Sequence, residues 1–314
     1  TDSLRRENEE LRLRAGTANE LIGVSQAADD MRLAIDRMAP TNSRVLITGP
    51  AGSGKEVVAR MLHARSMRAE GPFVVVNCAT MSPDRFEIEL FGSENPVGGS
   101  EAPQKVGTFE AAHNGTLFLD EVADMPMETQ GKIVRVLQEQ IFERVGGTTR
   151  VEVDVRVVAS STSNLAEEIK AGNFREDFFY RLNVVPLEVP PLNHRPEDIP
   201  PLAEHFMRHA AQTSGQPERT IGDDSLAVLQ GYSWPGNVRE LETFVRRWIL
   251  EGDTDHTLKT LGGHSDPEAG LSPVADAVSE IEIDTIVTTL NKTKWNRRKA
   301  SRLLGMSYSS LRRR

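Results

Sequence analysis

The chain has 314 residues, of which 38% are hydrophobic and 26% charged, with a formal net charge of −9. These values are typical of a globular protein with a sizeable core, and the length suggests two domains with a short additional segment. No apolar run approaches the roughly 18 residues of a membrane span, which excludes an integral membrane protein. With Cys78 as the single cysteine and no signal-peptide pattern, we expect no internal disulfide and a cytoplasmic fragment of a longer protein.

Residues 1–16 are rich in charged, helix-favouring side chains, with Leu4 and Leu11 seven residues apart. This pattern predicts a linker helix that joins a missing upstream domain. Two heptads are too few to decide between a short coiled coil and a solvated, frayed helix.

Helices alternate with short apolar strands between residues 21 and 189. The expected strands are residues 44–48, 73–77, 116–119, 155–159 and 184–189. Each strand is apolar on both faces or nearly so, as buried parallel strands are. With expected helices between them, including 55–64 and 128–138, this is the pattern of a doubly wound α/β domain with a parallel sheet.

The chain after Pro190-Pro191 has a different character. Residues 190–255 predict a helical subdomain, with helices at 199–211, 223–231 and 237–250. A polar linker is expected at 256–276, because residues 262–273 are rich in Gly, Ser and Pro. Residues 277–314 then predict a small all-α domain.

The segment from Gly49 to Lys55 fits the phosphate-binding pattern G-x-x-x-x-G-K. Its residues are Gly49, Pro50, Ala51, Gly52, Ser53, Gly54 and Lys55. It follows an expected strand and opens an expected helix, which a mere Gly-rich turn need not do. Backbone N–H groups would surround phosphates, and Lys55 would reach the outer ones. Glu56 stands where Ser or Thr would offer Mg²⁺ a hydroxyl, and is included among the nucleotide-binding candidates.

Two carboxylates, Asp120 and Glu121, follow the expected strand at 116–119. At the carboxyl edge of a parallel sheet, one carboxylate can organise Mg²⁺ through water and the next can polarise the attacking water. Such a pair is also a common solvated strand end. Its position after a phosphate loop favours an ATP site.

Several strings carry a resemblance to a known family. They are GPAGSGKE (49–56), NCA (77–79), ELFG (89–92), GTLFLDEV (115–122), FERVGG (142–147), FREDFFYRLNVV (174–185) and WPGNVREL (234–241). On these strings the chain resembles the AAA+ P-loop NTPase domain of bacterial enhancer-binding proteins, the activators of sigma-54 RNA polymerase. Among them it is most similar to NtrC-class response regulators of the NtrX type. This resemblance implies ATP and Mg as cofactors and a helical lid. It also implies an upstream receiver domain that accepts phosphate from a sensor histidine kinase.

The resemblance also implies roles for single residues. Asp120 and Glu121 would handle Mg²⁺ and water, and Asn77 would restrain the catalytic Glu121. Arg175 and Arg181 match arginine fingers that a protomer supplies to its neighbour. Because such a site is complete only between protomers, a homo-oligomer from a dimer to a hexameric or heptameric ring is expected.

Two further positions match sensors of the nucleotide. Arg239 matches sensor two. Ser161 and Thr162 fall at sensor one, where the family usually has Thr-Asn or Thr-His. The resemblance therefore does not carry sensing through a side-chain amide or imidazole over to this chain.

The largest departure from the family is the loop at 96–101. The string PVGGSE stands there in place of the family's GAFTGA, which touches sigma-54. Gly98 and Gly99 replace the aromatic and the hydroxyl of that contact, and an aromatic usually supplies much of the energy of a small contact. We therefore expect transcription regulation without the usual sigma-54 contact to RNA polymerase, the alternative being a loop variant that still makes it.

The end of the chain is basic. Residues 285–314 contain nine Lys or Arg residues and no Asp or Glu. The pattern from Trp295 to Arg312, with a turn at Gly305 and a helix cap at Ser307, predicts a helix-turn-helix that resembles the Fis type. The expected DNA-binding residues are Arg297, Arg298, Lys299, Ser307, Tyr308, Ser309, Ser310 and Arg312. A helical bundle with a basic surface is the alternative.

These observations predict a DNA-binding, ATP-hydrolysing AAA+ regulator of a two-component system. One alternative is a full sigma-54 activator ATPase, and another is a DNA-binding regulator whose nucleotide fold does not hydrolyse ATP. A AAA+ unfoldase would carry an aromatic pore loop and no helix-turn-helix, and this sequence shows the reverse.

Overall fold

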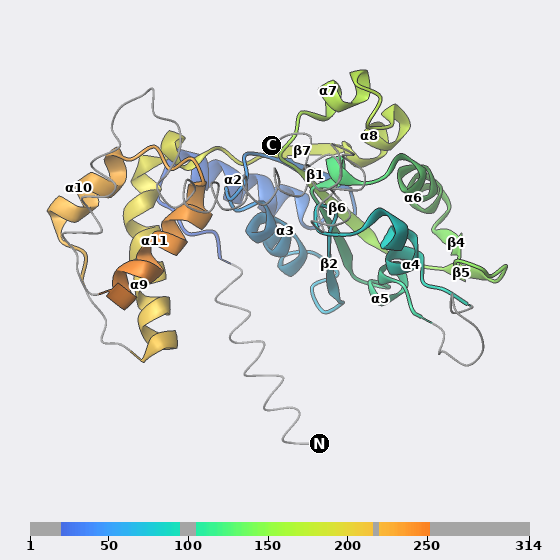
Figure 1. The fold of residues 1–314 in the computed structure, drawn as a ribbon, viewed down its shortest axis with the longest axis horizontal. Helices are drawn as coiled ribbons and strands as arrows, with labels where there is room; N and C mark the ends of the chain where they lie inside the picture. Colours follow the sequence, from blue (N-terminus) through green and yellow to red (C-terminus); the bar gives the residue numbers. More distant parts are fainter. Residues whose placement is uncertain (1–19, 95–104, 216–219, 252–314) are drawn as a thin grey trace, which may run out of the picture. The chain divides into compact units, whose positions relative to one another are not determined.

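The computed structural model describes residues 20–94, 105–215 and 220–251 (Figure 1). Within them the chain forms two compact units, one of residues 20–205 and 234–242, the other of residues 206–233 and 243–251. The linker helix predicted at 1–16, the loop at 96–101, the linker at 256–276 and the helix-turn-helix at 277–314 lie outside the described residues.

A five-stranded parallel sheet forms the centre of the first unit (Figure 1). Its strands are β1 (Val45–Thr48), β2 (Phe73–Asn77), β3 (Thr116–Asp120), β6 (Arg156–Ser161) and β7 (Val185–Glu188). Their spatial order is β2-β3-β6-β1-β7, and all neighbouring pairs are parallel. All five predicted strands are present with ends shifted by at most one or two residues. The predicted parallel α/β fold is thus confirmed.

Both faces of the sheet are apolar because alternate residues of a strand point to opposite sides. In β3, Leu117 and Leu119 belong to one buried cluster, and Phe118 belongs to the other. The same alternation separates Val157 from Val158 in β6. The core therefore consists of two layers of side chains with the sheet between them.

Helices cover each face of this sheet. One apolar cluster receives residues from α2 (Gln26–Met38) and α3 (Lys55–Ala64). The other receives residues from α4 (Phe86–Phe91), α5 (Thr108–Ala111), α6 (Met127–Glu139), α7 (Leu165–Lys170) and α8 (Glu176–Leu182). Helix α2 begins where the Ser25 side chain accepts from the N–H of Ala28, at 3.1 Å.

Some short elements were not predicted from the sequence. An antiparallel hairpin of β4 (Ile141–Glu143) and β5 (Arg150–Glu152) follows α6. Short 3₁₀ turns occur at Pro83–Arg85, Val122–Asp124, Leu192–His194 and Pro196–Asp198.

The described residues after β7 form helices and no strands, as predicted. Its helices are α9 (Ile199–Ser214), α10 (Asp223–Gly231) and α11 (Asn237–Glu251). Helix α10 has the predicted ends, and α9 extends three residues further than predicted. No helix in the described part of the chain is long and apolar enough to cross a membrane.

Candidate nucleotide site

The carboxyl ends of the strands bring the predicted site residues to one edge of the sheet. In register, Thr48 at the end of β1 pairs with Ser161 at the end of β6, and Asn77 at the end of β2 pairs with Asp120 at the end of β3. The loop from Gly49 to Lys55 starts at this edge. A sheet with this strand order therefore collects groups that are far apart in sequence.

The phosphate loop has a backbone shape that requires glycine. Gly52 and Gly54 have φ angles of 72° and 104°, in the left-handed region that side chains disfavour. A Cβ atom on Gly52 would lie 2.4 Å from the carbonyl oxygen of Gly236. Gly52 thus lets the loop pack directly against the backbone near residue 236.

Lys55 is the first residue of α3 and is buried. Its Nζ donates to the carbonyl oxygens of Gly49 (3.0 Å) and Pro50 (3.3 Å) and to Oγ1 of Thr162 (2.7 Å). Glu121 Oε1 lies 3.1 Å from the same nitrogen. The cation is therefore held inside the loop, where an incoming phosphate would meet it.

Glu56 lies on a different side of the helix. Its carboxylate accepts from Nη2 of Arg60, at 2.6 Å, and half of its side chain is exposed. It therefore makes an i,i+4 pair along α3, in contrast to Lys55 beside it.

Asp120 and Glu121 are both fixed by hydroxyl groups at the end of β6. Ser160 Oγ donates to Asp120 Oδ1 (2.5 Å) and accepts from the N–H of Glu121 (3.1 Å). Thr162 donates to Glu121 through its N–H (2.8 Å) and its Oγ1 (2.5 Å). Glu121 has a left-handed φ of 55°, a conformation that turns its side chain away from the strand path.

The two carboxylates differ in acidity. Burial raises the pKa of Asp120 above its ordinary value, despite the hydrogen bond from Ser160. Burial also acts to raise the pKa of Glu121, but the hydrogen bonds from Thr162 and the charge of Lys55 outweigh it, so the pKa of Glu121 is lowered. Glu121 is therefore ionised at neutral pH and can only accept hydrogen bonds there.

Asn77 contacts a different carboxylate from the one that the family resemblance suggests. Its Nδ2 lies 3.5 Å from Asp120 Oδ2, and its Oδ1 accepts from the N–H groups of Ala79 (3.0 Å) and Thr80 (3.2 Å). In this structure Glu121 is held by Thr162 and Lys55 instead.

Of the two residues predicted at the sensor-one position, Thr162 contacts Lys55 and Glu121. The hydroxyl of Ser161 donates to the carbonyl oxygen of Ser163, at 2.8 Å. Ser160, which no sequence motif singles out, contacts both Asp120 and Glu121. A hydroxyl near the end of a buried strand was the available signal, but its meaning depends on β6 lying beside β3.

The predicted arginine fingers lie away from the phosphate loop of their own chain. Arg175 is the N-cap residue of α8, and its guanidinium makes two bonds to the Asp177 carboxylate, at 2.9 and 2.8 Å. Its N–H donates to Oε1 of the buried Gln130. Arg181 lies in the last turn of α8 and is exposed. Within the described residues, neither arginine makes a hydrogen bond or an ion pair with the phosphate loop.

Arg239 approaches the phosphate loop through its backbone. Its N–H donates to the carbonyl oxygen of Gly52, at 3.3 Å, within the first compact unit. The segment WPGNVREL therefore contacts the phosphate loop, and the role of Arg239 as sensor two stays a prediction.

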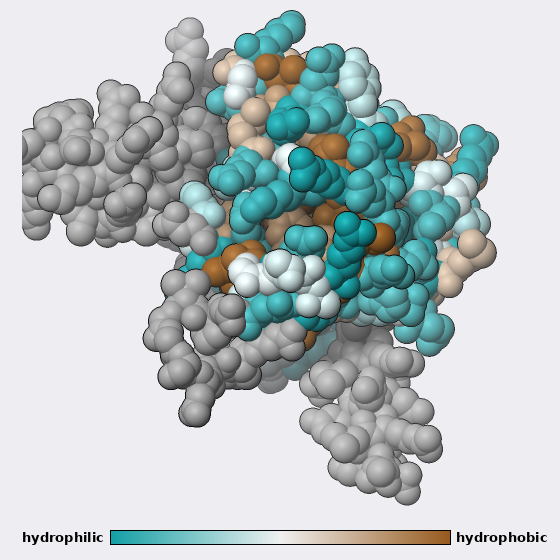
Figure 2. All heavy atoms as spheres, turned by 90° about the vertical axis from the view of Figure 1, so that its right-hand side faces the viewer, coloured by the Kyte–Doolittle hydropathy of each residue, from teal (hydrophilic) through white to brown (hydrophobic). Residues whose placement is uncertain are grey.

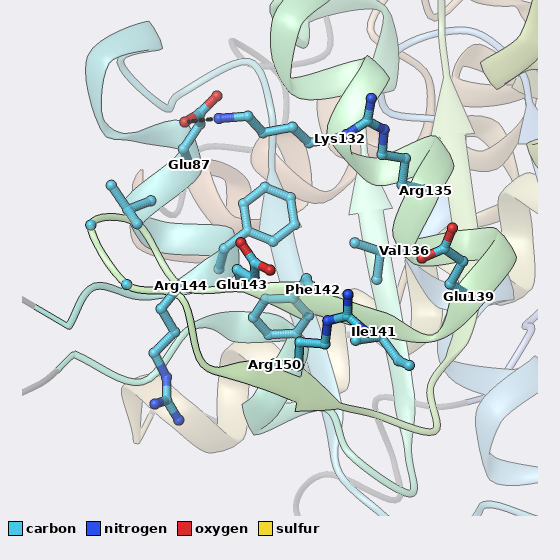
Figure 3. Close-up of a pocket in the computed structure, with 14 residues that line it drawn as sticks. Glu87, Lys132, Arg135, Val136, Glu139, Ile141, Phe142, Glu143, Arg144 and Arg150 are labelled. Atoms are coloured by element: carbon cyan, nitrogen blue, oxygen red, sulfur yellow. Dashed lines mark hydrogen bonds and ion pairs between the residues drawn. The ribbon is translucent and has the colours of Figure 1, made fainter.

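A hollow elsewhere on the first unit is separate from this site. It has a volume of about 470 Å³ and lies between α4, α6 and the β4–β5 hairpin. Figure 3 shows Lys132 of α6 paired with Glu87 of α4, at 2.5 Å, on its rim, and Phe142 within it. Figure 2, which views the molecule from the right-hand side of Figure 1, shows mainly hydrophilic residues with small separate hydrophobic patches. None of the residues that line the hollow belongs to the phosphate loop.

Family models match three consecutive parts of the chain. The Sigma-54 interaction domain matches residues 21–188, the AAA+ ATPase lid domain matches residues 193–261, and the bacterial regulatory protein domain of the Fis family matches residues 277–314. Together they confirm the AAA+ fold, the lid and the Fis-type helix-turn-helix that the sequence predicted.

Individual relatives agree with these matches. The chain is 43% identical to the nitrogen assimilation regulatory protein NtrX of Azorhizobium caulinodans, over 99% of this chain and 71% of that one. It is 40% identical to the response regulator protein PilR of Pseudomonas aeruginosa, over 94% of this chain and 68% of that one. The solved structure of NtrX from Brucella abortus in complex with ADP is 48% identical, has a TM-score of 0.74, and is matched over 99% of this chain and 71% of its own. The chain therefore belongs to the family of AAA+ transcriptional regulators with a sigma-54 interaction domain and a Fis-type helix-turn-helix, the NtrC and NtrX type of two-component response regulator.

Proposed function

We propose that the chain binds ATP at residues 49–55, hydrolyses it between protomers of an oligomer, and uses this cycle to regulate transcription from DNA bound by residues 277–314. One observation carries the proposal: Lys55, Glu121 and Thr162 form one hydrogen-bonded group at the carboxyl edge of the sheet. A phosphate-binding cation and a candidate for positioning water thus lie side by side. The related NtrX from Brucella abortus has been solved with ATP and with ADP, which supports nucleotide binding.

The carboxylates fit a role in holding Mg²⁺ and water. Within the described residues, the 3.5 Å contact from Asn77 is the one hydrogen bond to Oδ2 of Asp120, so this oxygen is available to a hydrated cation. Mg²⁺ commonly keeps several waters and binds through one or two carboxylates, and it would neutralise charge on the phosphate oxygens. Because Glu56 is engaged with Arg60, we assign the contact to Asp120.

Glu121 is the candidate for orienting the attacking water. Its ionised carboxylate can accept a proton or a hydrogen bond from water. In the structure, however, both of its oxygens accept from Thr162. We infer that this is a resting arrangement. It changes when a phosphate replaces Thr162 and Glu121 as partners of the Lys55 ammonium group.

Hydrolysis also needs positive charge at the reacting phosphate. Arg175 and Arg181 are the candidates, supplied by a neighbouring protomer, and such a group can raise the rate by about 10³–10⁵. The pair of Arg175 with Asp177 is exposed to solvent, and exposed ion pairs contribute little to stability. Arg175 can therefore leave Asp177 for a phosphate at little cost.

The DNA-binding role rests on the match of residues 277–314 to the Fis family and on the basic composition of residues 285–314. Contacts to DNA phosphates release counterions, so binding should weaken steeply with salt.

Two candidate functions differ in whether the protein contacts sigma-54. The match to a Sigma-54 interaction domain favours an activator of sigma-54 polymerase. The string PVGGSE at 96–101 favours regulation without the usual contact. We propose the second.

ATP hydrolysis measured over a range of protein concentrations, with and without DNA, tests this proposal. The rate per protomer should rise with concentration, and Glu121→Gln should abolish it while ATP still binds. A rate that is zero at all concentrations, with ATP bound, would favour a regulator whose nucleotide fold does not hydrolyse.

A further inference from the structure

Three successive carbonyl groups of the phosphate loop accept hydrogen bonds from outside the loop. Ala51 O accepts from Nδ2 of Asn237 (3.0 Å), and Ser53 O accepts from Nη2 of Arg195 (2.8 Å). Between them, Gly52 O accepts from the N–H of Arg239 (3.3 Å). We call Arg195, Asn237 and the backbone of Arg239 the outer clamp. All of its members belong to the first compact unit.

The outer clamp determines where the N–H groups of the loop point. A peptide unit is planar and trans, so its C=O and N–H point in opposite directions. Holding the carbonyls of Ala51 and Ser53 therefore turns the N–H groups of Gly52 and Gly54 away from the clamp. Within the described residues no protein group accepts from either of them, whereas Ser53 N donates to Pro50 O at 3.3 Å. Unoccupied backbone N–H groups of this kind bind phosphate oxygens in phosphate loops.

The side-chain amide of Asn237 is fixed by hydrogen bonds at both its oxygen and its nitrogen. It is buried, and its φ of 54° is in the left-handed region, which Asn tolerates better than most residues. Its Oδ1 accepts from the N–H of Leu192, at 2.8 Å, while its Nδ2 donates to Ala51 O. Both ends of the amide are thus used, and the donor faces the loop.

Arg195 is also held from behind. It is 2% exposed, and its Nη1 lies 3.8 Å from Oδ2 of the fully buried Asp198. Asp198 in turn accepts from the N–H groups of Val24 (2.6 Å) and Ser25 (2.7 Å) and from the Ser25 hydroxyl (2.8 Å).

The buried position of Arg195 is unfavourable for the stability of the fold. Its Nε has no hydrogen-bond partner within the described residues. A buried cation with an unmade bond is a poor source of stability. Its 2.8 Å bond to Ser53 O gives it another use, the placement of the Ser53–Gly54 peptide.

We infer that Arg195 and Asn237 are positioning residues for nucleotide binding, which act through the backbone of the phosphate loop and never touch the nucleotide. The inference rests on the proposed placement of phosphates at residues 49–55. A loop already in its binding shape loses less conformational freedom when a ligand binds, which raises affinity. The ligands that gain most are nucleoside di- and triphosphates, since the N–H groups of such a loop surround the α- and β-phosphates and a nucleoside monophosphate has no β-phosphate.

The test compares ADP with AMP in binding to the whole protein, by displacement of a fluorescent ADP analogue. Asn237→Asp keeps the left-handed backbone and the acceptor for Leu192 but loses the donor to Ala51. Asn237→Gly loses both the donor to Ala51 and the acceptor for Leu192, without adding charge. Arg195→Lys keeps the cation near Asp198 but loses the planar fork that reaches Ser53. Each variant should bind ADP about tenfold more weakly, the equivalent of one charge-assisted or buried hydrogen bond, and AMP less than about twofold more weakly.

Matched controls come from Asn114 and Lys55. Asn114 also has a left-handed φ, of 61°. It lies just before the amino end of β3, whereas the nucleotide site lies at the carboxyl end of that strand. Asn114→Asp and Asn114→Gly should leave both affinities unchanged. Lys55→Ala tests the phosphate site itself.

The outcomes separate the clamp from the site. Weaker ADP binding with nearly constant AMP binding, in variants whose thermal unfolding without nucleotide stays cooperative, supports the clamp. Unchanged ADP affinity in the Asn237 variants, or an equal loss for ADP and AMP, overturns it. If Asn237→Gly unfolds, Asn237→Asp decides, because it keeps the bond to Leu192. If Lys55→Ala alone weakens ADP binding, the clamp is wrong and the proposed site stands, whereas an unchanged Lys55→Ala overturns the site.

Discussion

The ammonium group of Lys55 lies 3.1 Å from the carboxylate of Glu121. The same ammonium donates to Thr162 and to two carbonyl oxygens of the phosphate loop. A phosphate that binds Lys55 must compete with these partners. We therefore expect nucleotide binding to weaken the contacts of Glu121 with Lys55 and Thr162. The Glu121 carboxylate would then be able to orient water only when a phosphate occupies the loop.

Lys55→Ala should weaken ATP binding far more than it affects folding. Hydrogen bonds to charged groups contribute about 1.5–3 kcal/mol, which corresponds to roughly tenfold to a hundredfold in affinity. Calorimetric titration with ATP and Mg²⁺ measures this loss. Lys132→Ala is the control, because Lys132 is an exposed lysine that pairs with Glu87 outside the site. Equal ATP affinity of the wild type and a well-folded Lys55→Ala would remove the basis of the site.

Thr162→Val should destabilise the protein in a pH-dependent way. The variant loses the hydroxyl that donates to Glu121, and this bond favours the ionised carboxylate. Because the pKa of Glu121 is lowered on folding, its contribution is complete above the ordinary pKa of 4.5 and is lost as pH falls through the lowered value. The free energy of unfolding should fall by about 1 kcal/mol at pH 7, since Thr162 is exposed, and by less at pH 3.

Urea unfolding of the wild type, Thr162→Val and Thr162→Ser between pH 7 and pH 3 measures this effect. Thr162→Ser keeps the hydroxyl and should stay close to the wild type. A difference between the wild type and Thr162→Val that is the same at pH 7 and at pH 3 would show that Glu121 is not the cause.

Replacement of the string PVGGSE at 96–101 by GAFTGA should change the dependence on sigma-54. We expect the full-length protein to give no ATP-dependent opening of a sigma-54 promoter. Glycine has more backbone conformations to lose than other residues, so fixing Gly98 and Gly99 in a contact would cost about 1–2 kcal/mol each, and Glu101 adds a negative charge where the family has Ala. The exchanged loop, which keeps the spacing, should restore binding to sigma-54.

In vitro transcription on paired templates, one read by sigma-54 polymerase and one by the housekeeping polymerase, decides this point. Robust ATP-dependent activation of the sigma-54 template by the unchanged protein would mean that PVGGSE still makes the contact.

The sheet and the long helices could be predicted because their signals are local. Strand β2 and helices α3 and α10 have the predicted ends, since apolar runs and turn residues mark them in the sequence. The hairpin of β4 and β5 was missed because each strand has three residues, mixed in polarity, which no periodicity can reveal.

The site could be predicted only in part, for a geometric reason. The loop at 49–55 and the pair Asp120-Glu121 follow from their own motifs. The contacts of Ser160 and Thr162 depend on β6 lying next to β3, and local patterns do not contain the order of strands. The bonds of Asn237 and Arg195 to the loop join residues 186 and 142 positions apart, so they too required the folded chain.

The central claim, that two protomers share one hydrolytic site, is tested most directly by mixing variants. Arg181→Ala and Glu121→Gln should each bind ATP and hydrolyse it poorly. When they are mixed equally and assemble at random, about a quarter of the interfaces combine an intact Glu121 with an intact Arg181, and activity should return in that proportion. A mixture of Arg175→Ala with Arg181→Ala should stay inactive, because no protomer then supplies both arginines. No recovery for Arg181→Ala with Glu121→Gln at any ratio, in preparations shown to co-assemble, would contradict the shared site.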